Sequence, residues 1–393
     1  MRIAHVNICD NGSTGKIILD IFSCLQESDE KVAFVSLKYT QNPQVKPIHS
    51  RNQYRVHKFL AMYLGLDEFG DYFETKRLIK ELKKFKPDVL HLHNIHSYAL
   101  NYRLLFKYIK KENVRVIWTL HDCWAFTGGC SHFDYNDCKK WRTDCKKCPH
   151  LKSAGILTGV NVTGKLYKIK KEAFTGVKDM TVICPSMWLS GLVEQSFLGE
   201  YPIKVINNGI NLDVFKPTAS GVFDGIIDSQ KQAVLSVASV WSEKKGYNDL
   251  IKILGVLPNK YQLVVVGVDD NQKQELEEKG AVAIKRTNNQ TELAELYTKA
   301  AVFINPTYED TFPTTNIEAL ACGCPIVCYK TGGATEMLNK DNSVVVDRGD
   351  YLSMAEALDK AVDLSKNAEK NIKVVRDKYS KETMVENYKR LYL

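Results

Sequence analysis

The segment PTYEDTFPTTNIEALACGCP (residues 306–325) carries two carboxylates at a spacing suited to sugar binding. Asp310 falls in a loop after a predicted strand, and Glu318 falls about one turn into a helix expected to begin at 313–315. Free amides and the helix dipole attract phosphate to a helix start, and carboxylates accept hydrogen bonds from hydroxyls. The pattern predicts a phosphosugar ligand. The alternative is a structural role, in which the Asp caps the helix and the Glu lies on its surface.

A cysteine cluster suggests a second kind of chemistry. Five of the 11 cysteines lie within residues 123–148. The cluster ends in a Cys-x-x-Cys pair, as structural zinc prefers, and its candidate ligands are Cys130, Cys138, Cys145 and Cys148. In a reducing compartment this favours a metal over disulfides, with unpaired thiols or one oxidised pair as the alternative. Residues 123–160 show no sustained periodicity, which is typical of a functional loop or one held by a metal or ligand.

Other patterns point away from nucleotide hydrolysis and redox chemistry. The stretch NGSTGKI (residues 11–17) resembles a phosphate-binding loop, but it lacks the first glycine and has Ile17 where Ser or Thr must hold magnesium. No GxGxxG motif occurs, and no Asp-x-Asp pair offers the usual handle for a divalent metal. His91, His93 and His96 lie at the end of a predicted strand, where we expect hydrogen bonding in preference to metal ligation.

The elements that must position these residues alternate along the whole chain. Short β-branched runs predict strands, a first series at 2–8, 31–35, 88–93, 114–120 and 181–184, and a second at 203–206, 233–238, 262–266, 301–305, 325–328 and 343–346. Amphipathic stretches predict helices at 76–86, 291–299 and 316–321. Two such series predict two Rossmann-like, doubly wound α/β domains.

We place these domains at 1–203, with a Cys-rich loop at 123–150, and at 204–376. A terminal helix at 377–393 is expected to pack back towards the first domain.

Composition and charge bear on location. The sequence is 44% hydrophobic and 25% charged, ordinary values for a globular protein. No apolar run approaches the ~20 residues of a membrane span, and no apolar signal core follows Met1, so a cytoplasmic protein is expected. Residues 1–200 hold 30 lysines and arginines against 20 acidic residues. This basic excess suits an anionic partner, or else is a solvated lysine-rich surface.

One segment of the basic half predicts contact with a membrane. The apolar stretch FLAMYLGL (residues 59–66) precedes a basic helical stretch at 76–86, a pattern typical of interfacial binders. Its lysines are Lys76, Lys80, Lys83 and Lys84. We expect peripheral attachment to the inner face of the cell membrane, unless Leu78, Leu82 and Phe85 face the protein core.

Taken in order, these motifs resemble glycosyltransferase family 4, the retaining enzymes with the GT-B fold. The family's acidic-x7-Glu signature matches Asp310 and Glu318. The remaining matches, along nearly the whole chain, are the glycine loop 11–16, His121-Asp122, Ser186, Asn208-Gly209 with Asp213, Phe215 and Pro217, and the Gly332-Gly333-x-x-Glu336 loop. The resemblance implies two Rossmann-like domains facing each other across a cleft.

The resemblance also implies a metal-independent transfer from a nucleotide sugar, UDP- or GDP-linked, with no other cofactor. Asp310 would hold sugar hydroxyls, Glu318 the ribose and Lys245 the diphosphate, while His121 would lie near the reacting sugar. Further implied donor-binding positions are Gly12, Gly15, Lys244, Arg286 and Thr287 within 285–288 beside the base, and the backbone of Phe312, Pro313, Thr314 and Thr315. The implied acceptor is a saccharide or lipid-linked saccharide of a surface polysaccharide, and no nucleic-acid partner is expected.

Two departures from the family pattern bear on the turnover rate and on the choice of sugar donor. Ser239 stands where the family usually has an arginine, so either Lys244 supplies that charge or turnover is slow. Pro313 replaces a glycine, but Pro in a first helical turn and Thr as a cap still support a helix start. Two alternatives stay open: a nucleotide-sugar epimerase of the same architecture, and a catalytically silent partner subunit that binds glycans.

Overall fold

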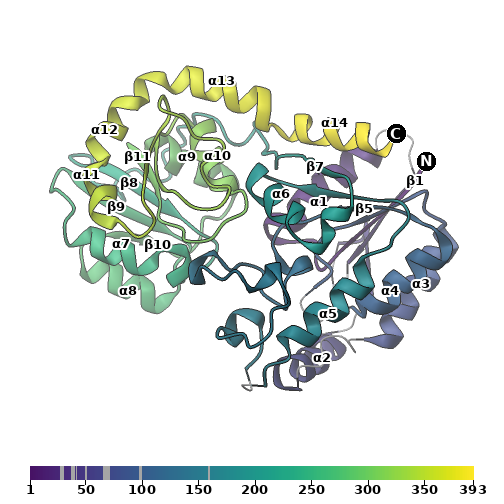
Figure 1. The fold of residues 1–393 in the computed structure, drawn as a ribbon. Coiled ribbons are helices and arrows are strands. Elements are labelled where there is room, and N and C mark those ends of the chain that lie inside the picture. The colour runs from purple at the N-terminus through teal and green to yellow at the C-terminus, as the bar shows by residue number, and fades with distance from the viewer. Residues whose placement is uncertain are drawn as a thin grey trace. The chain divides into compact units, whose positions relative to one another are not determined.

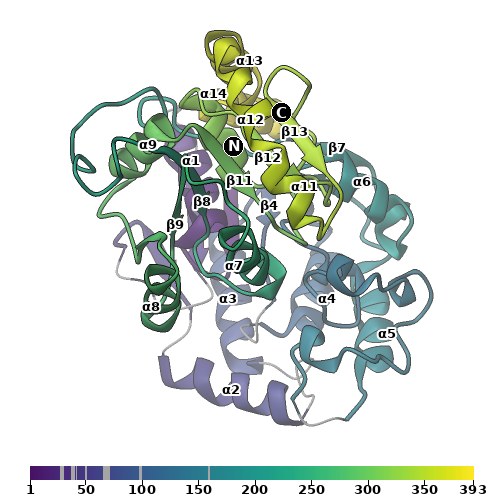
Figure 2. The ribbon, with the colours of Figure 1, turned by 90° about the vertical axis from the view of Figure 1, so that its left-hand side faces the viewer.

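The structure is a computed structural model. It describes residues 1–26, 31–36, 40, 42–48, 51–64, 71–96, 100–157 and 160–393. The chain divides into two compact units. Unit 1 comprises Met1–Asn207 with Val385–Leu393, and unit 2 comprises Asn208–Met384. In Figure 1 and Figure 2 each unit is a twisted sheet covered by helices.

Unit 1 is built on a parallel sheet with the strand order β3-β2-β1-β4-β5-β6-β7 among its described residues. Its strands are β1 (Arg2–Asn7), β2 (Lys31–Ser36), β3 (Val45–Pro47), β4 (Val89–Leu92), β5 (Arg115–Thr119), β6 (Met180–Cys184) and β7 (Ile203–Val205). β1, β4, β5 and β6 are almost wholly buried, as expected of parallel strands covered on both faces.

One strand belongs to a different sheet from the one predicted. The run at 203–206 was assigned to the second series, but as β7 it pairs in parallel with β6 and is the last strand of the first sheet. Its residues are only partly buried. The local pattern predicted the strand, whereas its partner is set by long-range packing.

The helices of unit 1 place apolar stripes on this sheet. They are α1 (Gly12–Gln26), α2 (Arg51–Leu64), α3 (Tyr72–Phe85), α4 (Tyr102–Glu112), α5 (Thr163–Phe174) and α6 (Met187–Glu194). α3 buries Leu78 and Leu82 in the core and ends at Lys86, whose backbone is left-handed and donates to the Leu82 carbonyl. Asn101 caps α4 by accepting from the Leu104 amide. Between β5 and α5, the described residues (120–157 and 160–162) form only short 3-10 turns, at Trp124–Phe126, Asp134–Asn136, Lys140–Arg142 and Leu151–Ala154.

Unit 2 has a second parallel sheet, with the order β10-β9-β8-β11-β12-β13 among the described residues. Its strands are β8 (Gln232–Val237), β9 (Tyr261–Val266), β10 (Val282–Ile284), β11 (Val302–Asn305), β12 (Ile326–Tyr329) and β13 (Ser343–Val346). Its helices are α7 (Tyr247–Leu254), α8 (Asp270–Glu278), α9 (Gln290–Lys299), α10 (Thr314–Ala321), α11 (Tyr351–Glu356), α12 (Leu358–Val362) and α13 (Ala368–Tyr379).

Alternate residues of these strands fill two separate cores. Leu235, Val264 and Phe303 pack with residues of α9, α10 and α13. Val234 and Val265 pack on the opposite face with residues of α7, α8, α11 and α12. Helices therefore cover both faces of this sheet.

The end of the chain returns to unit 1. Helix α14 (Lys381–Tyr392) begins in unit 2, and its residues from Val385 onwards belong to unit 1. The turn before it runs against the Asn208-Gly209 segment, where Ile210 bridges to Ser380. Gly209 lies so close to this turn that a Cβ would come within 2.5 Å of the Ser380 carbonyl oxygen. Glycine is therefore required there.

Candidate functional site

Each sheet has a point where the strand order reverses, and polar residues gather at the carboxyl ends of the strands there. In unit 2 the reversal lies between β8 and β11, and in unit 1 it lies between β1 and β4. Ligands of doubly wound folds bind outside the carboxyl ends of the strands at this switch point. The segments that follow β8 and β11 contain Lys244, Lys245 and Asp310, which sequence analysis had singled out.

Two ion pairs join these segments. Lys245 Nζ lies 2.8 Å from Asp310 Oδ2 and 3.3 Å from the Glu309 carbonyl oxygen. Lys244 Nζ lies 3.0 Å from Glu309 Oε2, and the Glu309 side chain is 3% exposed. The backbone reinforces the join, because the Tyr308 amide donates to the Lys244 carbonyl. The structure therefore brings both lysines and Asp310 into one charged cluster.

Glycines permit this close approach. Gly246 follows Lys245 with φ +82°, and a Cβ there would lie 2.2 Å from the Pro306 carbonyl oxygen. Gly332 has φ +49°, and a Cβ there would lie 2.1 Å from the Asp310 carbonyl oxygen, which accepts from the Gly333 amide at 3.1 Å. Any other residue would push the loop of Asp310 away from its neighbours.

Helix α10 starts beside this cluster. It begins at Thr314, as predicted, with Pro313 as the preceding residue and Phe312 buried. The Phe312 amide donates to Asp310 Oδ1 at 3.1 Å, so the carboxylate also orders the chain entering the helix. Thr315 lies in the first turn and is half-buried.

Glu318 lies on the same helix and is held by a buried tyrosine. The Tyr297 hydroxyl, on α9, donates to Glu318 Oε2 at 3.3 Å, and burial raises the pKa of Tyr297 well above its usual value. The phenol therefore stays neutral and donates. Asn316 anchors the helix from its other side through the Asn305 side chain and the Ala334 carbonyl.

The other predicted donor-binding residues of unit 2 lie at the ends of nearby strands. Ser239 is exposed two residues after β8. Arg286 is exposed and Thr287 is half-buried after β10, which is separated from β8 by β9. No contact joins these three to the charged cluster among the hydrogen bonds of the described chain.

In unit 1 the predicted His121 belongs to a buried histidine array. His5 Nδ1 lies 3.3 Å from His93 Nε2, and His93 Nδ1 lies 3.3 Å from His121 Nε2. His91 bonds the Tyr392 hydroxyl at 2.7 Å and the Thr119 hydroxyl at 2.8 Å. Because β1, β4 and β5 are neighbours in register, these rings stack at adjacent strand ends.

Burial keeps the array neutral. It lowers the pKa of His5 to about 3 and of His121 to about 4, and it holds those of His91 and His93 well below the usual value. Ligand nitrogens of His5, His91 and His93 lie within 4.8 Å of one another, close enough for a metal. However, both ring nitrogens of His91 and of His93 are already hydrogen-bonded. The array is therefore a hydrogen-bond network, as expected for histidines at a strand end.

Asp122 is the charged neighbour of this array. Burial opposes its ionisation, but the charge and hydrogen bond of His96 outweigh burial and lower the pKa of Asp122 to about 2. Its other oxygen accepts from the Trp124 amide at 2.8 Å. Asp122 thus fixes the start of the Cys-rich segment directly after His121.

The two predicted glycines of the first loop differ in their roles. Gly12 opens α1 with φ +72° and has open space where a Cβ would be. Gly15 is buried, and a Cβ there would lie 2.5 Å from the carbonyl carbon of Asp10. Gly15 therefore lets the loop fold onto α1. Ser186, another residue of the family pattern, caps α6 by accepting from the Leu189 amide.

Sequence reasoning missed three residues of these sites. Glu309 was overlooked beside Asp310, Tyr297 lay within an ordinary helical pattern, and His5 sat in a strand of apolar residues. These residues can be recognised as part of a site only when it is known which strands are neighbours. Only then does a buried acid lie next to a lysine pair, and only then do histidines of different strands come together.

Models of two glycosyltransferase families match most of the chain. The model described as Glycosyltransferase Family 4 matches residues 14–214, and that described as Glycosyl transferases group 1 matches residues 223–378. The putative colanic acid biosynthesis glycosyl transferase WcaC of Escherichia coli K12 is 24% identical over 370 residues, covering 90% of this chain and 88% of that protein.

Solved structures resemble the fold. Sucrose-phosphate synthase from Thermosynechococcus elongatus superimposes with a TM-score of 0.70 at 16% identity, covering 100% of this chain and 98% of that one. Anabaena HepE in complex with UDP-glucose gives a TM-score of 0.67 at 12% identity, covering 100% and 99% of the two chains. The predicted GT-B fold is confirmed.

Proposed function

Because the chain belongs to glycosyltransferase family 4 and is a glycosyltransferase, we propose that it transfers a sugar, with retention, from a nucleotide-diphosphate sugar to a saccharide or lipid-linked saccharide in surface-polysaccharide assembly. The observation that carries this proposal is the cluster of Lys244, Lys245 and Asp310 beside the first turn of α10. WcaC, the relative named for colanic acid biosynthesis, supports the choice of pathway.

In this proposal the cluster stabilises the leaving group. Negative charge grows on the diphosphate as the bond to the sugar breaks, while the sugar becomes cation-like. Lys245 and the amides of the first turn of α10 provide fixed positive charge for the diphosphate without a divalent metal. Asp310 binds sugar hydroxyls and Glu318 binds the ribose.

The Lys245–Asp310 pair gives the site a defined arrangement before the donor binds. A lone ammonium would be free to move, whereas here a carboxylate holds it at 2.8 Å. When the donor binds, the diphosphate takes over the ammonium and the sugar hydroxyls take over the carboxylate. Lys244, held by buried Glu309, supplies the charge that the missing arginine at position 239 would have given.

The donor carries uridine or guanosine diphosphate, and a UDP-hexose is the first to test because HepE was solved with UDP-glucose. The test incubates the protein with UDP- and GDP-sugars and measures free nucleotide diphosphate with and without a saccharide acceptor. A transferase releases the diphosphate faster with acceptor. An epimerase changes the sugar without release, and a silent subunit binds without either change. Release that is equal in wild type and Lys245→Ala would refute the assigned site.

We also propose that unit 1 attaches transiently to the inner face of an anionic membrane from the cytoplasm. No described helix is both long and apolar enough to span a bilayer. The apolar stripe of 76–86 is not available to lipid, because Leu78 and Leu82 lie in the core. Exposed aromatics on α2 and at the start of α3 offer apolar surface instead: Phe59 (58% exposed), Tyr63, Tyr72 and Phe73 (82% exposed). Residues 65–66 of the predicted apolar stretch lie outside the described residues.

The lysines of α3 supply the charge for this attachment. Lys76, Lys80 and Lys84 are exposed, and each lysine near an anionic surface contributes ~1 kcal/mol. Liposome flotation at low salt should recover wild type with anionic vesicles and lose it when Lys76, Lys80, Lys83 and Lys84 are reversed to Glu. The matched control reverses four exposed lysines of unit 2: Lys231, Lys340, Lys373 and Lys378. Failure of wild type to float would mean that the acceptor is reached from solution.

A further inference from the structure

The segment 123–157 in unit 1 needs something to hold it besides regular structure. Only short 3-10 turns occur within it, yet it contains buried aromatic residues. Phe133 and Trp141 stack with ring centroids 5.2 Å apart, and Phe126 meets Trp141 edge-on at 5.4 Å. A long segment of irregular backbone inside a compact domain is commonly held by a ligand or a cross-link.

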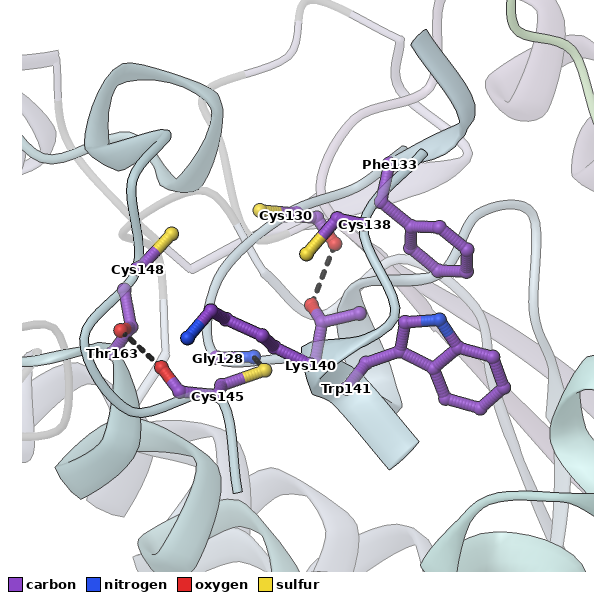
Figure 3. A pocket seen from close by; sticks show the side chains of 10 residues that line it. Gly128, Cys130, Phe133, Cys138, Lys140, Trp141, Cys145, Cys148 and Thr163 are labelled. Atoms are coloured by element: carbon purple, nitrogen blue, oxygen red, sulfur yellow. Dashed lines mark hydrogen bonds between the residues drawn. The ribbon is translucent and has the colours of Figure 1, made fainter. Parts of the chain in front are cut away.

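Four cysteines of this segment surround one small cavity (Figure 3). Cys130, Cys138, Cys145 and Cys148 all line it, with Lys140, Trp141 and Thr163 among the other lining residues. The cavity volume is about 20 Å³, which is room for one occupant the size of a water molecule or an ion. Four cysteines around a space for one atom match the ligand types of structural zinc. No three of their sulfurs lie within 4.8 Å of one another in the described chain, so zinc would have to draw them closer together.

The backbone around the cavity is already arranged to support sulfur ligands. The Gly128 amide donates to Cys145 Sγ at 3.2 Å, and the His150 amide donates to Cys148 Sγ at 3.4 Å. Hydrogen bonds of this kind stabilise thiolates and orient metal ligands. A Cβ at residue 128 would lie 2.6 Å from the Thr163 carbonyl oxygen and 2.8 Å from Cys145 Cβ. Glycine is therefore required for the amide to reach the sulfur.

The Cys-x-x-Cys turn has an unusual backbone. Cys145 (φ +51°) and Lys147 (φ +48°) both occupy the left-handed region without being glycine. Such residues cost free energy unless their surroundings fix them. A metal that bonds both ends of the turn would supply that constraint.

A buried lysine adds charge complementarity. Lys170 on α5 is fully buried, and its ammonium donates to the carbonyls of Trp124 (2.8 Å) and Thr127 (3.1 Å). The charge of Lys170 acts on both Cys130 and Cys145, so the ammonium lies near two of the four cysteines. A zinc ion with four thiolates carries a net charge of −2, which a nearby ammonium stabilises.

We propose that Cys130, Cys138, Cys145 and Cys148 bind one Zn²⁺ in a closed, tetrahedral structural site. The four thiols each lose a proton to solvent as four Zn–S bonds form at ~2.3 Å. The metal would hold the segment that follows His121-Asp122 and take no part in sugar transfer. The histidine array is the weaker metal site, because His91 and His93 have both ring nitrogens hydrogen-bonded.

Elemental analysis of the full-length protein, purified under reducing conditions without added metal, tests the proposal. About one zinc per chain is expected in wild type and in Cys24→Ser, whose cysteine lies outside the cluster on α1. Zinc should fall to near zero in the double variant Cys138→Ser/Cys148→Ser. Replacement by Co²⁺ should give the intense visible absorption of a tetrahedral tetrathiolate site.

Wild type itself provides a test that does not depend on a variant folding. Chelation should release the zinc and expose residues 123–157 to limited proteolysis, and re-addition of Zn²⁺ should restore protection. A metal-free protein that takes up no Zn²⁺ after full reduction would overturn the site. Zinc that persists in the double variant would place the metal elsewhere and overturn it equally.

Discussion

The carboxyl ends of the two sheets hold polar groups of different kinds. At the switch point of unit 1, four imidazoles pack against one another in the core and are kept neutral by burial. At the switch point of unit 2, two lysines and two acids form ion pairs in which Lys244 and Lys245 remain more than one-third exposed. Both sites use the same position in the same kind of fold.

The difference matches what each site can bind. Fixed ammonium groups that water can reach suit a ligand that brings two or three negative charges of its own. The buried imidazoles are less suited to direct ligand contact, because each ring offers one donor and one acceptor and both ring nitrogens of His91 and His93 are already hydrogen-bonded. Through the chain His5–His93–His121, the tautomer of His121 is coupled to that of His5, whose Nε2 has no hydrogen-bond partner among the described residues.

The largest expected effect comes from removing charge in unit 2. Lys245→Ala should lower kcat about 10²–10³-fold, because a fixed positive charge whose contact strengthens as the leaving group departs is lost. Steady-state release of nucleotide diphosphate measures this, with circular dichroism to establish that the fold persists.

Lys252→Ala is the matched control for Lys245→Ala. Lys252 also pairs with an aspartate, at 2.9 Å, but on α7 and away from the strand ends. Its loss should leave kcat within about twofold. A kcat of Lys245→Ala similar to that of wild type would remove Lys245 from the site.

A smaller effect is expected from the histidines, on stability rather than turnover. A histidine whose folded pKa lies below its unfolded value of 6.5 stays unprotonated when folded and takes up a proton when unfolded. Its contribution to the free energy of unfolding is complete above pH 6.5. As the pH falls below this value, the free energy of unfolding decreases by about 1.4 kcal/mol per pH unit. For His5 this window runs from pH 6.5 down to about 3, its folded pKa.

His5→Phe should therefore reduce the pH dependence of unfolding between pH 6.5 and 4.5 by about 1.4 kcal/mol per pH unit. Urea unfolding followed by tryptophan fluorescence reports mainly on unit 1, which holds Trp118, Trp124, Trp141 and Trp188 of the 5 tryptophans. The slope against pH is the readout, so a general loss of stability does not mimic it. An unchanged slope in His5→Phe would mean that His5 is protonated in the folded protein.

The sequence was informative wherever a local pattern decides the structure. β-branched runs located most strands within one or two residues, and Pro313-Thr314 located the start of α10. The three-residue strands β3 and β10 were missed because they are too short to show alternation. The sheet of β7, the Lys244–Glu309 pair and the histidine array depend on which strands become neighbours, and no local pattern contains that information.

The smallest expected effect tests how unit 2 positions a carboxylate. Tyr297→Phe removes the hydroxyl that donates to Glu318 at 3.3 Å but keeps the buried ring. Loss of one hydrogen bond to a charged group costs about 1.5–3 kcal/mol when geometry is good. At this longer distance we expect a smaller loss, equivalent to a three- to tenfold weaker binding of the donor. Since Glu318 is assigned to the ribose, which stays bound throughout the reaction, the loss should appear in KM for the donor with kcat nearly unchanged.

Tyr261→Phe, whose hydroxyl bonds Asp359 at the surface, is the control and should change neither constant. A fall in kcat with unchanged KM would instead place Glu318 at the reacting sugar.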